Sequence, residues 1–435
     1  MTTWKASMSE NPTAADSADP VGAVTAPTAE GPAGPPAERA AVVDLDAIAH
    51  NVRTLRERLT RPDGTRALLT AVVKADAYGH GATPVARAAL AAGADRLGVA
   101  HVSEALALRA AGVDGEILAW LHTVHTDFAA AVAADVTLGV SGWDLEAVAD
   151  AARAVGRTAR VHLKLDTGLG RNGATAAQWP QLVDRAAALQ AEGVLAVEGM
   201  FSHLAVADEP ARAAETDAQL AAFHAGFQRL QAAGLGGDRP VVRHLANTPA
   251  ALTRDDVHLD MVRIGLGIYG LSPFEGTSAE QLGLRPAMSV RTSLANLKEV
   301  PADQGVSYGY LYRTAGPTRL GLIPLGYADG VPRVATHAPV QVGGRRLEVV
   351  GRVAMDQMVV DLGPAADASR TGERVGTPVE LFGPASGIPA DAWAAAAGSI
   401  NYELVTRLGA RLTRIHVHGT PALAADLPAV TEGRP

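Results

Sequence analysis

Short apolar runs alternate with alanine-rich segments along the chain from Ala41 to about Arg285. The runs are rich in leucine and β-branched residues and have the length of buried strands, whereas the segments between them have helical period. The pattern predicts eight strands, at 68–73, 96–100, 116–120, 136–140, 159–165, 195–201, 241–244 and 261–264. Strands and helices that alternate in this way form a parallel sheet, most simply a closed (β/α)8, TIM-like barrel.

The pattern changes after about Arg285, where the alanine-rich helices stop. Stretches such as SVRTSLANLKEV, RLGLIPLGYADG and TPVELFG read as strands separated by turns. They predict a second, mainly β domain. We therefore expect an α/β fold in which the barrel spans 39–285 and the β domain spans 286–420.

The two ends of the chain have a different composition. Residues 1–38 are rich in Ala, Pro, Thr, Ser and Gly and contain EGPAGPPAE, which cannot hold a helix or bury much surface. We expect a disordered tail there and a flexible C-terminus at 421–435. The start has neither the regions of a signal peptide nor a stretch that could span a membrane, so we expect a cytoplasmic protein.

Composition narrows the possible functions. The 435 residues carry 38 basic and 46 acidic side chains, a net charge of -8 without a long basic run. This balance argues against nucleic acid or an anionic membrane as a partner and leaves small-molecule chemistry. The chain has no cysteine, which excludes disulfides, thiolate metal sites and cysteine nucleophiles. We expect no metal.

Lys74 follows the first predicted barrel strand, at the face of the barrel where catalytic side chains gather. A lysine held in a pocket there can lose its proton, because burial disfavours the charged form, and can then form an imine with an aldehyde cofactor. The alternative is an ordinary surface lysine that ends a strand. Tyr78, four residues later, can point its hydroxyl at a phosphate if the loop coils.

The loops after the seventh and eighth strands, HLANTPAAL and MVRIGLGIYG, lie where such barrels commonly bind phosphate. Thr248 offers a hydroxyl there, while Gly265 and Leu266 offer backbone N–H groups with little side chain in the way. A plain tight turn is the competing interpretation of the glycines. Their place after the last strand favours an anion cradle.

Two arginines stand at informative positions. Arg263 lies in the eighth strand between apolar residues, where a charge must be paired or functional. Arginine keeps its proton, so an Arg263 that faces the pyridine nitrogen of a cofactor would leave that nitrogen unprotonated. The alternative is a structural ion pair.

After the fifth strand, GLGRNG matches the dinucleotide-binding GxGxxG pattern only weakly, since an arginine fills the turn and no acid stands at the expected distance. We expect Arg171 to be a pocket residue at the mouth of the barrel.

Eight motifs occur along the chain in one order: VVKADAYGHG, HLKLDTGLGRNG, FSHLAVADE, MVRIGLGIYG, VSYG, LGYADG, GRVAMDQ and INYE. Together they resemble alanine racemase, from about Ala41 to about Arg414. The resemblance implies a barrel that binds pyridoxal 5'-phosphate (PLP) and a β domain, in agreement with the strand pattern. It also implies a homodimeric enzyme that interconverts L- and D-alanine and supplies D-alanine for peptidoglycan.

The resemblance also implies roles for single residues. Lys74 would hold the cofactor as an imine and act as the base on one face of the substrate's α-carbon. Tyr308, from the partner subunit, would be the base on the other face, although a lone tyrosine beside a glycine is usually a packing residue. The other implied cofactor contacts are Tyr78, Arg171, His203, His244, Thr248, Arg263, Gly265, Leu266 and Tyr402. The implied substrate contacts are Arg171, Met355, Tyr327, Asp356 and Arg333.

Within these sets, His244 would support Arg263, and His203 would back the tyrosine base. In some members of the family the lysine that matches Lys164 carries a carbamate that positions the arginine that matches Arg171. An ordinary surface pair between Lys164 and Asp166 is the alternative. Two positions depart from the family pattern, because Thr248 stands where many members have Ser and Asp76 where many have Asn; neither is one of the expected bases.

Other functions stay open at this level. A broader-specificity or serine racemase would share these motifs. A non-catalytic PLP carrier built on the same barrel usually lacks a second domain, and a fold-related decarboxylase would need a cysteine, which this chain lacks. An NAD-linked oxidoreductase rests on the weak GLGRNG match alone.

Overall fold

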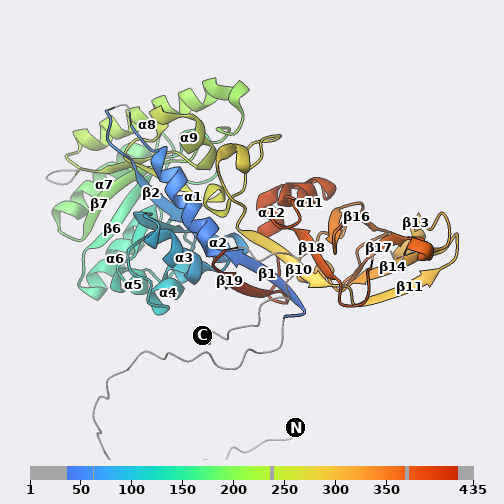
Figure 1. The fold of residues 1–435 in the computed structure, drawn as a ribbon. Helices are drawn as coiled ribbons and strands as arrows, with labels where there is room; N and C mark the ends of the chain where they lie inside the picture. The colour runs from blue at the N-terminus through green and yellow to red at the C-terminus, as the bar shows by residue number, and fades with distance from the viewer. Residues whose placement is uncertain (1–36, 62, 236–239, 368–371, 420–435) are drawn as a thin grey trace, which may run out of the picture.

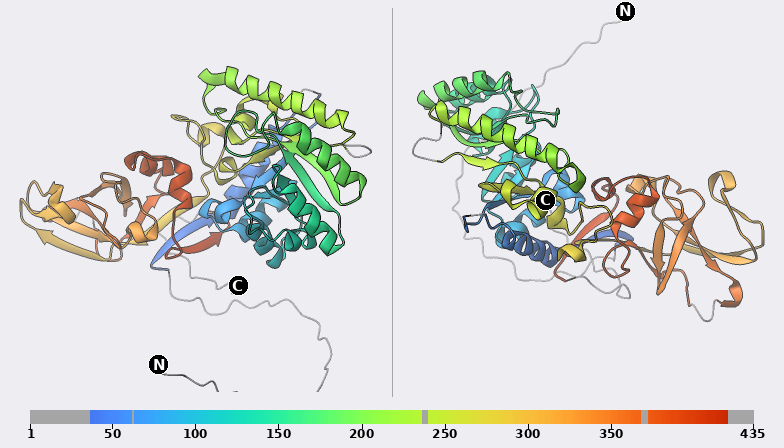
Figure 2. Two further views of the ribbon diagram at one scale, coloured as in Figure 1. Left: turned by 180° about the vertical axis from the view of Figure 1, so that it is seen from behind. Right: turned by 90° about the horizontal axis from the view of Figure 1, so that it is seen from above.

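The structure is a computed structural model that describes residues 37–61, 63–235, 240–367 and 372–419. It consists of a barrel surrounded by helices and a second domain built mainly of strands, which extends from one side of the barrel (Figures 1 and 2). The predicted tail and flexible C-terminus lie almost wholly outside the described residues. No helix among those described is long and apolar enough to cross a membrane.

Eight parallel strands form the barrel and confirm the predicted fold class. They are β2 (Leu68–Val72), β3 (Arg96–Val99), β4 (Glu116–Ala119), β5 (Thr137–Val140), β6 (Ala159–Lys164), β7 (Leu195–Phe201), β8 (Val242–His244) and β9 (Met261–Ile264). The sheet runs in the order β8-β7-β6-β5-β4-β3-β2-β9. Between β8 and β9 the Asp260 N–H donates to the Arg243 carbonyl at 3.1 Å, and the Arg263 N–H to the Ala246 carbonyl at 3.0 Å. These two bonds nearly close the ring.

Helices cover the outside of the barrel (Figure 1). They include α1 (Leu45–Glu57), α3 (Ala82–Ala91), α4 (Val102–Ala110), α5 (Phe128–Ala133), α6 (Leu145–Val155), α7 (Trp179–Ala191), α8 (Ala213–Ala232) and α9 (Thr248–Thr253). Helix α6 shows why these segments fold in this way: Leu145, Val148, Ala149 and Ala152 are buried at helical spacing, so one face packs on the sheet while the rest meets water.

The second domain is a nine-stranded sheet with the order β11-β14-β17-β16-β15-β18-β10-β1-β19. Its strands are β1 (Arg39–Asp44), β10 (Met288–Ser293), β11 (Asn296–Val300), β14 (Thr318–Ile323), β15 (Pro339–Val342), β16 (Arg345–Val350), β17 (Met358–Gly363), β18 (Pro378–Phe382) and β19 (Thr413–Val417). A separate pair, β12 (Gly305–Val306) and β13 (Tyr312–Arg313), follows β11 in the chain, and α11 (Ala390–Ala396) and α12 (Asn401–Thr406) precede β19.

Strand β1 belongs to this sheet although it precedes the barrel in the chain. Ala41 lies opposite Val290 of β10 in antiparallel register and opposite Arg414 of β19 in parallel register. The predicted barrel range, which begins at residue 39, therefore includes a strand that pairs with the β domain. The two ends of the described chain lie side by side and join the two parts of the fold.

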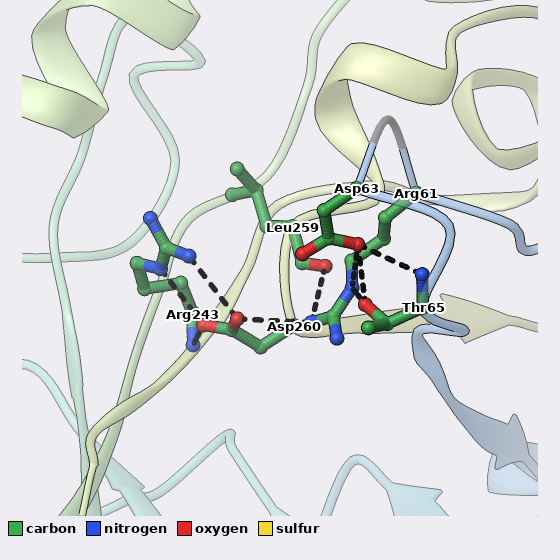
Figure 3. Close-up of polar contacts among 6 residues, drawn as sticks. All are labelled: Arg61, Asp63, Thr65, Arg243, Leu259 and Asp260. Atoms are coloured by element: carbon green, nitrogen blue, oxygen red, sulfur yellow. Dashed lines mark hydrogen bonds and ion pairs between the residues drawn. The ribbon is translucent and has the colours of Figure 1, made fainter.

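Charged contacts fasten the end of the barrel where the strands begin (Figure 3). Asp260 precedes β9 and accepts from Arg243 Nε at 2.8 Å and from Arg61 Nη1 at 3.3 Å. Arg243 is in β8, and Arg61 lies in the loop before β2. One carboxylate thus ties three neighbouring segments at the face opposite the carboxyl ends of the strands.

Candidate active site

Lys74 lies at the carboxyl end of β2 and is followed by a turn with a left-handed backbone. The segment α2 (Lys74–Gly79) contains four successive residues in the left-handed region, Ala75 to Tyr78, with φ of 52° to 53°. Side chains other than glycine cost roughly 1–2 kcal/mol per residue in this conformation. Such strain persists only where the surrounding structure fixes the backbone, so this turn indicates a constrained site.

The environment of Lys74 favours the neutral amine. Burial is the largest cause of its lowered pKa, followed by the positive charge of Arg171; Glu104 raises the pKa, and Arg263 lowers it. A lysine that is neutral near working pH can act as a nucleophile and as a base. The alternative of an ordinary surface lysine does not agree with this setting.

Tyr78, Thr248 and Gly265 converge beside this turn. The Gly265 N–H donates to the Thr248 hydroxyl at 3.2 Å. A Cβ on Gly265 would lie 2.3 Å from the Tyr78 hydroxyl oxygen, so only glycine fits there. Tyr402 of α12 stands next to Tyr78, with ring centroids 6.3 Å apart. Burial raises the pKa of Tyr402 to about 12, so its hydroxyl remains a hydrogen-bond donor.

The cradle continues into the short helix η3 (Leu266–Tyr269). Leu266 begins that helix directly after Gly265. The structure therefore gathers these predicted cofactor contacts: the buried Tyr78 phenol, the half-buried Tyr402 phenol, the Thr248 hydroxyl and the backbone at Gly265 and Leu266. This set suits an anion with several oxygen atoms.

Arg263 is buried in β9 and is fixed by several acceptors. Its Nη1 donates to His244 Nδ1 at 2.8 Å, and its Nη2 to the Ser202 carbonyl at 2.7 Å and to His203 Nδ1 at 3.3 Å. Burial lowers the pKa of Arg263 to about 10. Because its described partners are neutral acceptors rather than a carboxylate, the alternative of a structural ion pair for Arg263 is not found. Burial holds the pKa of His203 and of His244 well below the usual range, and the positive charge of Arg263 is the second largest cause.

Lys164 ends β6 on the same face and is 7% exposed. Its Nζ lies 5.3 Å from the centre of the Phe201 ring. Burial, followed by the positive charges of Arg263 and Arg171, lowers its pKa to about 8, although Asp166 raises it. The Asp166 carboxylate instead accepts from the Gly168 and Gly170 N–H groups, so the surface pair with Lys164 is not found among the described contacts.

A second group of predicted residues lies in the β domain. Tyr308, which begins η5 (Tyr308–Tyr310), is 71% exposed, and Met355 is 53% exposed. The Ser307 hydroxyl donates to the Arg352 carbonyl at 2.6 Å, which ties the Tyr308 turn to the loop of Met355. A cavity of about 510 Å³ opens beside them and includes Tyr308 and Ala354 in its lining.

The same loop of the β domain also meets the entrance residues. The Tyr327 N–H donates to the Ala354 carbonyl at 3.0 Å and the Ala328 N–H to the Met355 carbonyl at 2.9 Å. Asp356 accepts from Arg411 Nη1 at 2.8 Å. Arg333 follows in the same stretch and is exposed. The predicted substrate residues other than Arg171 thus form one exposed group.

Within one chain these two groups are apart. Figure 1 places β13, which follows Tyr308 in the sequence, at the end of the β domain far from the barrel, and α2 next to the barrel. The views of Figure 2 show the same separation from two more directions. A single chain therefore does not bring Tyr308 to Lys74.

One buried and one half-buried side chain belong to the site although the sequence patterns did not single them out. His162 of β6 lies with Nδ1 2.8 Å from His244 Nε2. Glu104 of α4 accepts from the Ala75 N–H at 2.6 Å. His162 begins the motif HLKLDTGLGRNG, and Glu104 lies four residues after a predicted strand. A polar residue in or near an apolar strand is a signal that many structural residues share.

Comparisons with known proteins show the family of this chain. Two family models match the chain, the N-terminal domain of alanine racemase over residues 43–273 and its C-terminal domain over 287–416. An alanine racemase of Frankia casuarinae is 51% identical over 399 residues, which cover 91% of this chain and all of that protein. One of Streptomyces coelicolor is 50% identical and covers 87% of this chain and 95% of that protein.

Solved structures give the same result. The alanine racemase of Streptomyces lavendulae, described as a D-cycloserine producer, superposes with a TM-score of 0.83 at 48% identity, covering 89% of this chain and 98% of that one. The Streptomyces coelicolor enzyme superposes with a TM-score of 0.82 at 49% identity, covering 88% and 98%. With both family domains matched in order and half of the residues identical to those of named enzymes, this chain belongs to the alanine racemase family.

Proposed function

We propose that this chain interconverts L-alanine and D-alanine with PLP in a composite site, where Lys74 is one base and Tyr308 of a second copy is the other. The observation that carries the proposal is the division of the site. One chain provides an anion cradle beside a lysine whose pKa is lowered by burial, whereas its exposed Tyr308 belongs to η5, just before β13, which lies far from the barrel.

The residues of the barrel fit PLP by shape and charge. A Cβ on Gly265 would lie 2.3 Å from the Tyr78 hydroxyl oxygen, so the glycine lets this phenol approach the backbone at Gly265, where its hydroxyl can donate to a phosphate. Arg263 offers N–H donors and keeps its own proton, so it suits an unprotonated ring nitrogen. The cradle also lies on the barrel face and after the strands where phosphate is commonly bound.

When bound, PLP accepts the electrons that the α-carbon of the amino acid releases. The chain has to place proton acceptors on both faces of that carbon. Lys74, with its pKa lowered by burial and by Arg171, can hold a proton at Nζ on one face. A positioned base typically contributes ~10²–10⁴-fold to the rate.

Tyr308 of the second copy would serve the other face, with His203 beside it. Arg263 donates to His203 Nδ1, so the neutral ring carries its proton on Nε2. That N–H can donate to a phenol oxygen and favour its charged form. The Met355 N–H, next to Tyr308, would donate to the substrate carboxylate, and Tyr327, Arg333 and Asp356 would line the entrance.

Lys164 is proposed to carry a carbamate. Lys74, Lys164, Arg171 and Arg263 bring four basic side chains to one face. Asp166 raises the pKa of Lys164, but among the described residues no carboxylate forms an ion pair with Lys164 Nζ. A pKa of about 8 leaves part of this lysine as the free amine, which is the form that reacts with CO2. The carbamate would replace a positive charge with a negative one beside Arg171.

Three further points rest on the family resemblance. We propose a homodimer, a cytoplasmic location and a role of D-alanine in peptidoglycan synthesis. Alanine is the proposed substrate, while serine or a wider range of amino acids would need a roomier pocket.

The test uses the purified full chain with added PLP. Started from D-alanine or from L-alanine, the optical rotation should decay to the same racemic end point. A panel that includes D-serine measures the substrate range. A protein that binds PLP but leaves both enantiomers unchanged would be a carrier rather than a racemase, and the proposal would then fail.

A further inference from the structure

One carboxylate joins the lysine turn to the next strand of the barrel. Glu104 lies in the first turn of α4, after β3. Its Oε1 accepts from the Ala75 N–H at 2.6 Å, and its Oε2 accepts from the Ala100 and His101 N–H groups at 2.9 Å each. Glu104 therefore binds three backbone donors from two loops at once.

The Oε2 contacts alone are those of a helix cap, in which a glutamate in the first turn accepts from the N-cap residue. The Oε1 contact has no part in that cap, because Ala75 belongs to the loop after β2. A residue that only ended α4 would not need it. The contact of Oε1 therefore has a role other than capping α4.

Glu104 Oε1 holds the left-handed turn that follows Lys74. Its first residue is Ala75, directly after Lys74, and the Ala75 N–H is held by Glu104. Farther along, the Ala77 N–H donates to the Val73 carbonyl at 2.9 Å, and the Asp76 carboxylate accepts from the Ala82 N–H at 2.7 Å. The Val73 N–H, on the other side of Lys74, donates to the Gly98 carbonyl of β3 at 2.8 Å. Glu104 is thus the contact from a neighbouring strand–helix unit that holds the first left-handed residue after Lys74.

The turn sets the direction of two side chains of the site. Lys74 begins it and Tyr78 is its last left-handed residue other than glycine. If the backbone relaxed toward the right-handed region, which non-glycine residues prefer, Lys74 and Tyr78 would no longer face the same space. Whatever holds the first N–H of the turn therefore positions the lysine.

Charge adds a second connection. Burial, Arg171 and Arg263 lower the pKa of Lys74, while Glu104 raises it. Glu104 thus opposes two guanidinium groups that face the lysine from β9 and from the loop after β6. Loss of its charge would lower the pKa of Lys74 further.

We propose that Glu104 is a positioning residue for Lys74, which holds the left-handed turn through Oε1 and supplies the negative charge that balances Arg171 and Arg263. This inference rests on the proposed role of Lys74 as the cofactor lysine. Glu104 does not touch the reacting atoms and acts through the backbone of Ala75.

The experiment compares Glu104→Gln with Asp127→Asn in the full-length holoenzyme. Asp127 is a matched control, because its carboxylate caps the neighbouring helix α5 by accepting from the Ala130 N–H at 2.8 Å and makes no described contact with the lysine turn. The readouts are amide hydrogen exchange of a peptide that covers 74–79, the pH midpoint of the absorbance of the lysine-bound cofactor, and kcat and KM for alanine.

For Glu104→Gln we expect exchange in 74–79 at least about tenfold faster, a midpoint moved to lower pH and kcat reduced more than KM. Asp127→Asn should keep all three at the parental values. Glu104→Asp keeps the charge but is too short to reach both loops, so it should restore the midpoint and leave the exchange fast. This second variant also covers the case in which the glutamine variant does not fold.

Parental exchange and a parental midpoint in Glu104→Gln would overturn the inference, as would equal changes in Asp127→Asn. Lys74→Ala, measured in parallel, separates this outcome from failure of the proposed function. If Lys74→Ala still shows the absorbance of a lysine-bound cofactor and racemises alanine, the role of Lys74 is wrong. If Lys74→Ala is inactive and Glu104→Gln behaves like the parent, only the role of Glu104 is wrong.

Discussion

Arg263 Nη1 lies 2.8 Å from His244 Nδ1 inside the barrel, and this contact fixes the protonation of both rings behind it. A guanidinium only donates, so His244 Nδ1 accepts and its Nε2 carries the proton. His244 Nε2 lies 2.8 Å from His162 Nδ1, which must then accept in turn. Burial lowers the pKa of His162 to about 3, so His162 is neutral. The three side chains form one chain of donors that starts at Arg263.

His162→Leu should disturb this chain. It leaves the His244 N–H buried without an acceptor, which costs roughly 1–3 kcal/mol, and it frees His244 to change tautomer and release Arg263. We expect lower stability in urea. We also expect more transamination, because the ring nitrogen of PLP can be protonated once Arg263 no longer faces it; pyruvate released from alanine measures this side reaction. His162→Asn is the control, because its amide oxygen can accept in place of Nδ1. Equal pyruvate release from the leucine variant and the parent would contradict the prediction.

Gly265→Ala should weaken cofactor binding. The new methyl group would lie 2.3 Å from the Tyr78 hydroxyl oxygen, so the phenol must move away from the cradle. We expect the Kd for PLP to rise at least about tenfold, equal to about 1.4 kcal/mol, when it is measured by absorbance titration.

Gly344→Ala provides the matched control, because a Cβ there meets nothing within 4 Å. This variant should bind PLP like the parent. Unchanged affinity in Gly265→Ala would show that Tyr78 and Gly265 do not shape the cofactor site.

The carbamate on Lys164 should depend on pH in a defined direction. The reaction needs the neutral amine, and with a pKa of about 8 the neutral fraction rises from about one tenth at pH 7 to about nine tenths at pH 9. At fixed dissolved CO2, carbamate occupancy should therefore increase with pH. A carbamate signal in 13C NMR with labelled bicarbonate measures it, and Lys164→Arg should remove that signal. Electron density that shows a bare amine at Lys164 would contradict the prediction.

The fold could be predicted from the sequence because each barrel strand is an apolar run bounded by helical segments. The prediction of 68–73 corresponds to β2 (Leu68–Val72), and that of 261–264 to β9 (Met261–Ile264). Strand β1 has the same apolar character, but the residues that pair with it, in β10 and β19, lie about 250 and 370 residues later in the chain. No local pattern shows a pairing of that length.

The candidate site was predictable where a motif marks it and not where tertiary contacts create it. Lys74, Thr248 and Gly265 follow strands, so their common face follows from the barrel alone. The left-handed turn after Lys74 has no sequence signal, because Ala75 and Ala77 favour right-handed helices. His162 and Glu104 likewise acquire their roles from partners in other strands.

In the proposed composite site, Lys74 of one subunit and Tyr308 of another serve the same carbon. Lys74→Ala and Tyr308→Phe homodimers should each be inactive in racemisation. When the two variants are unfolded together and refolded as a mixture, each mixed dimer has one site with both native bases and one site with neither.

The decisive measurement is therefore the racemase activity of that mixture. Random pairing makes half of the dimers mixed, so we predict recovery of roughly one quarter of the activity of the parent carried through the same refolding. If the refolded mixture contains mixed dimers and still shows no activity, the two bases do not come from different subunits and the composite site is wrong.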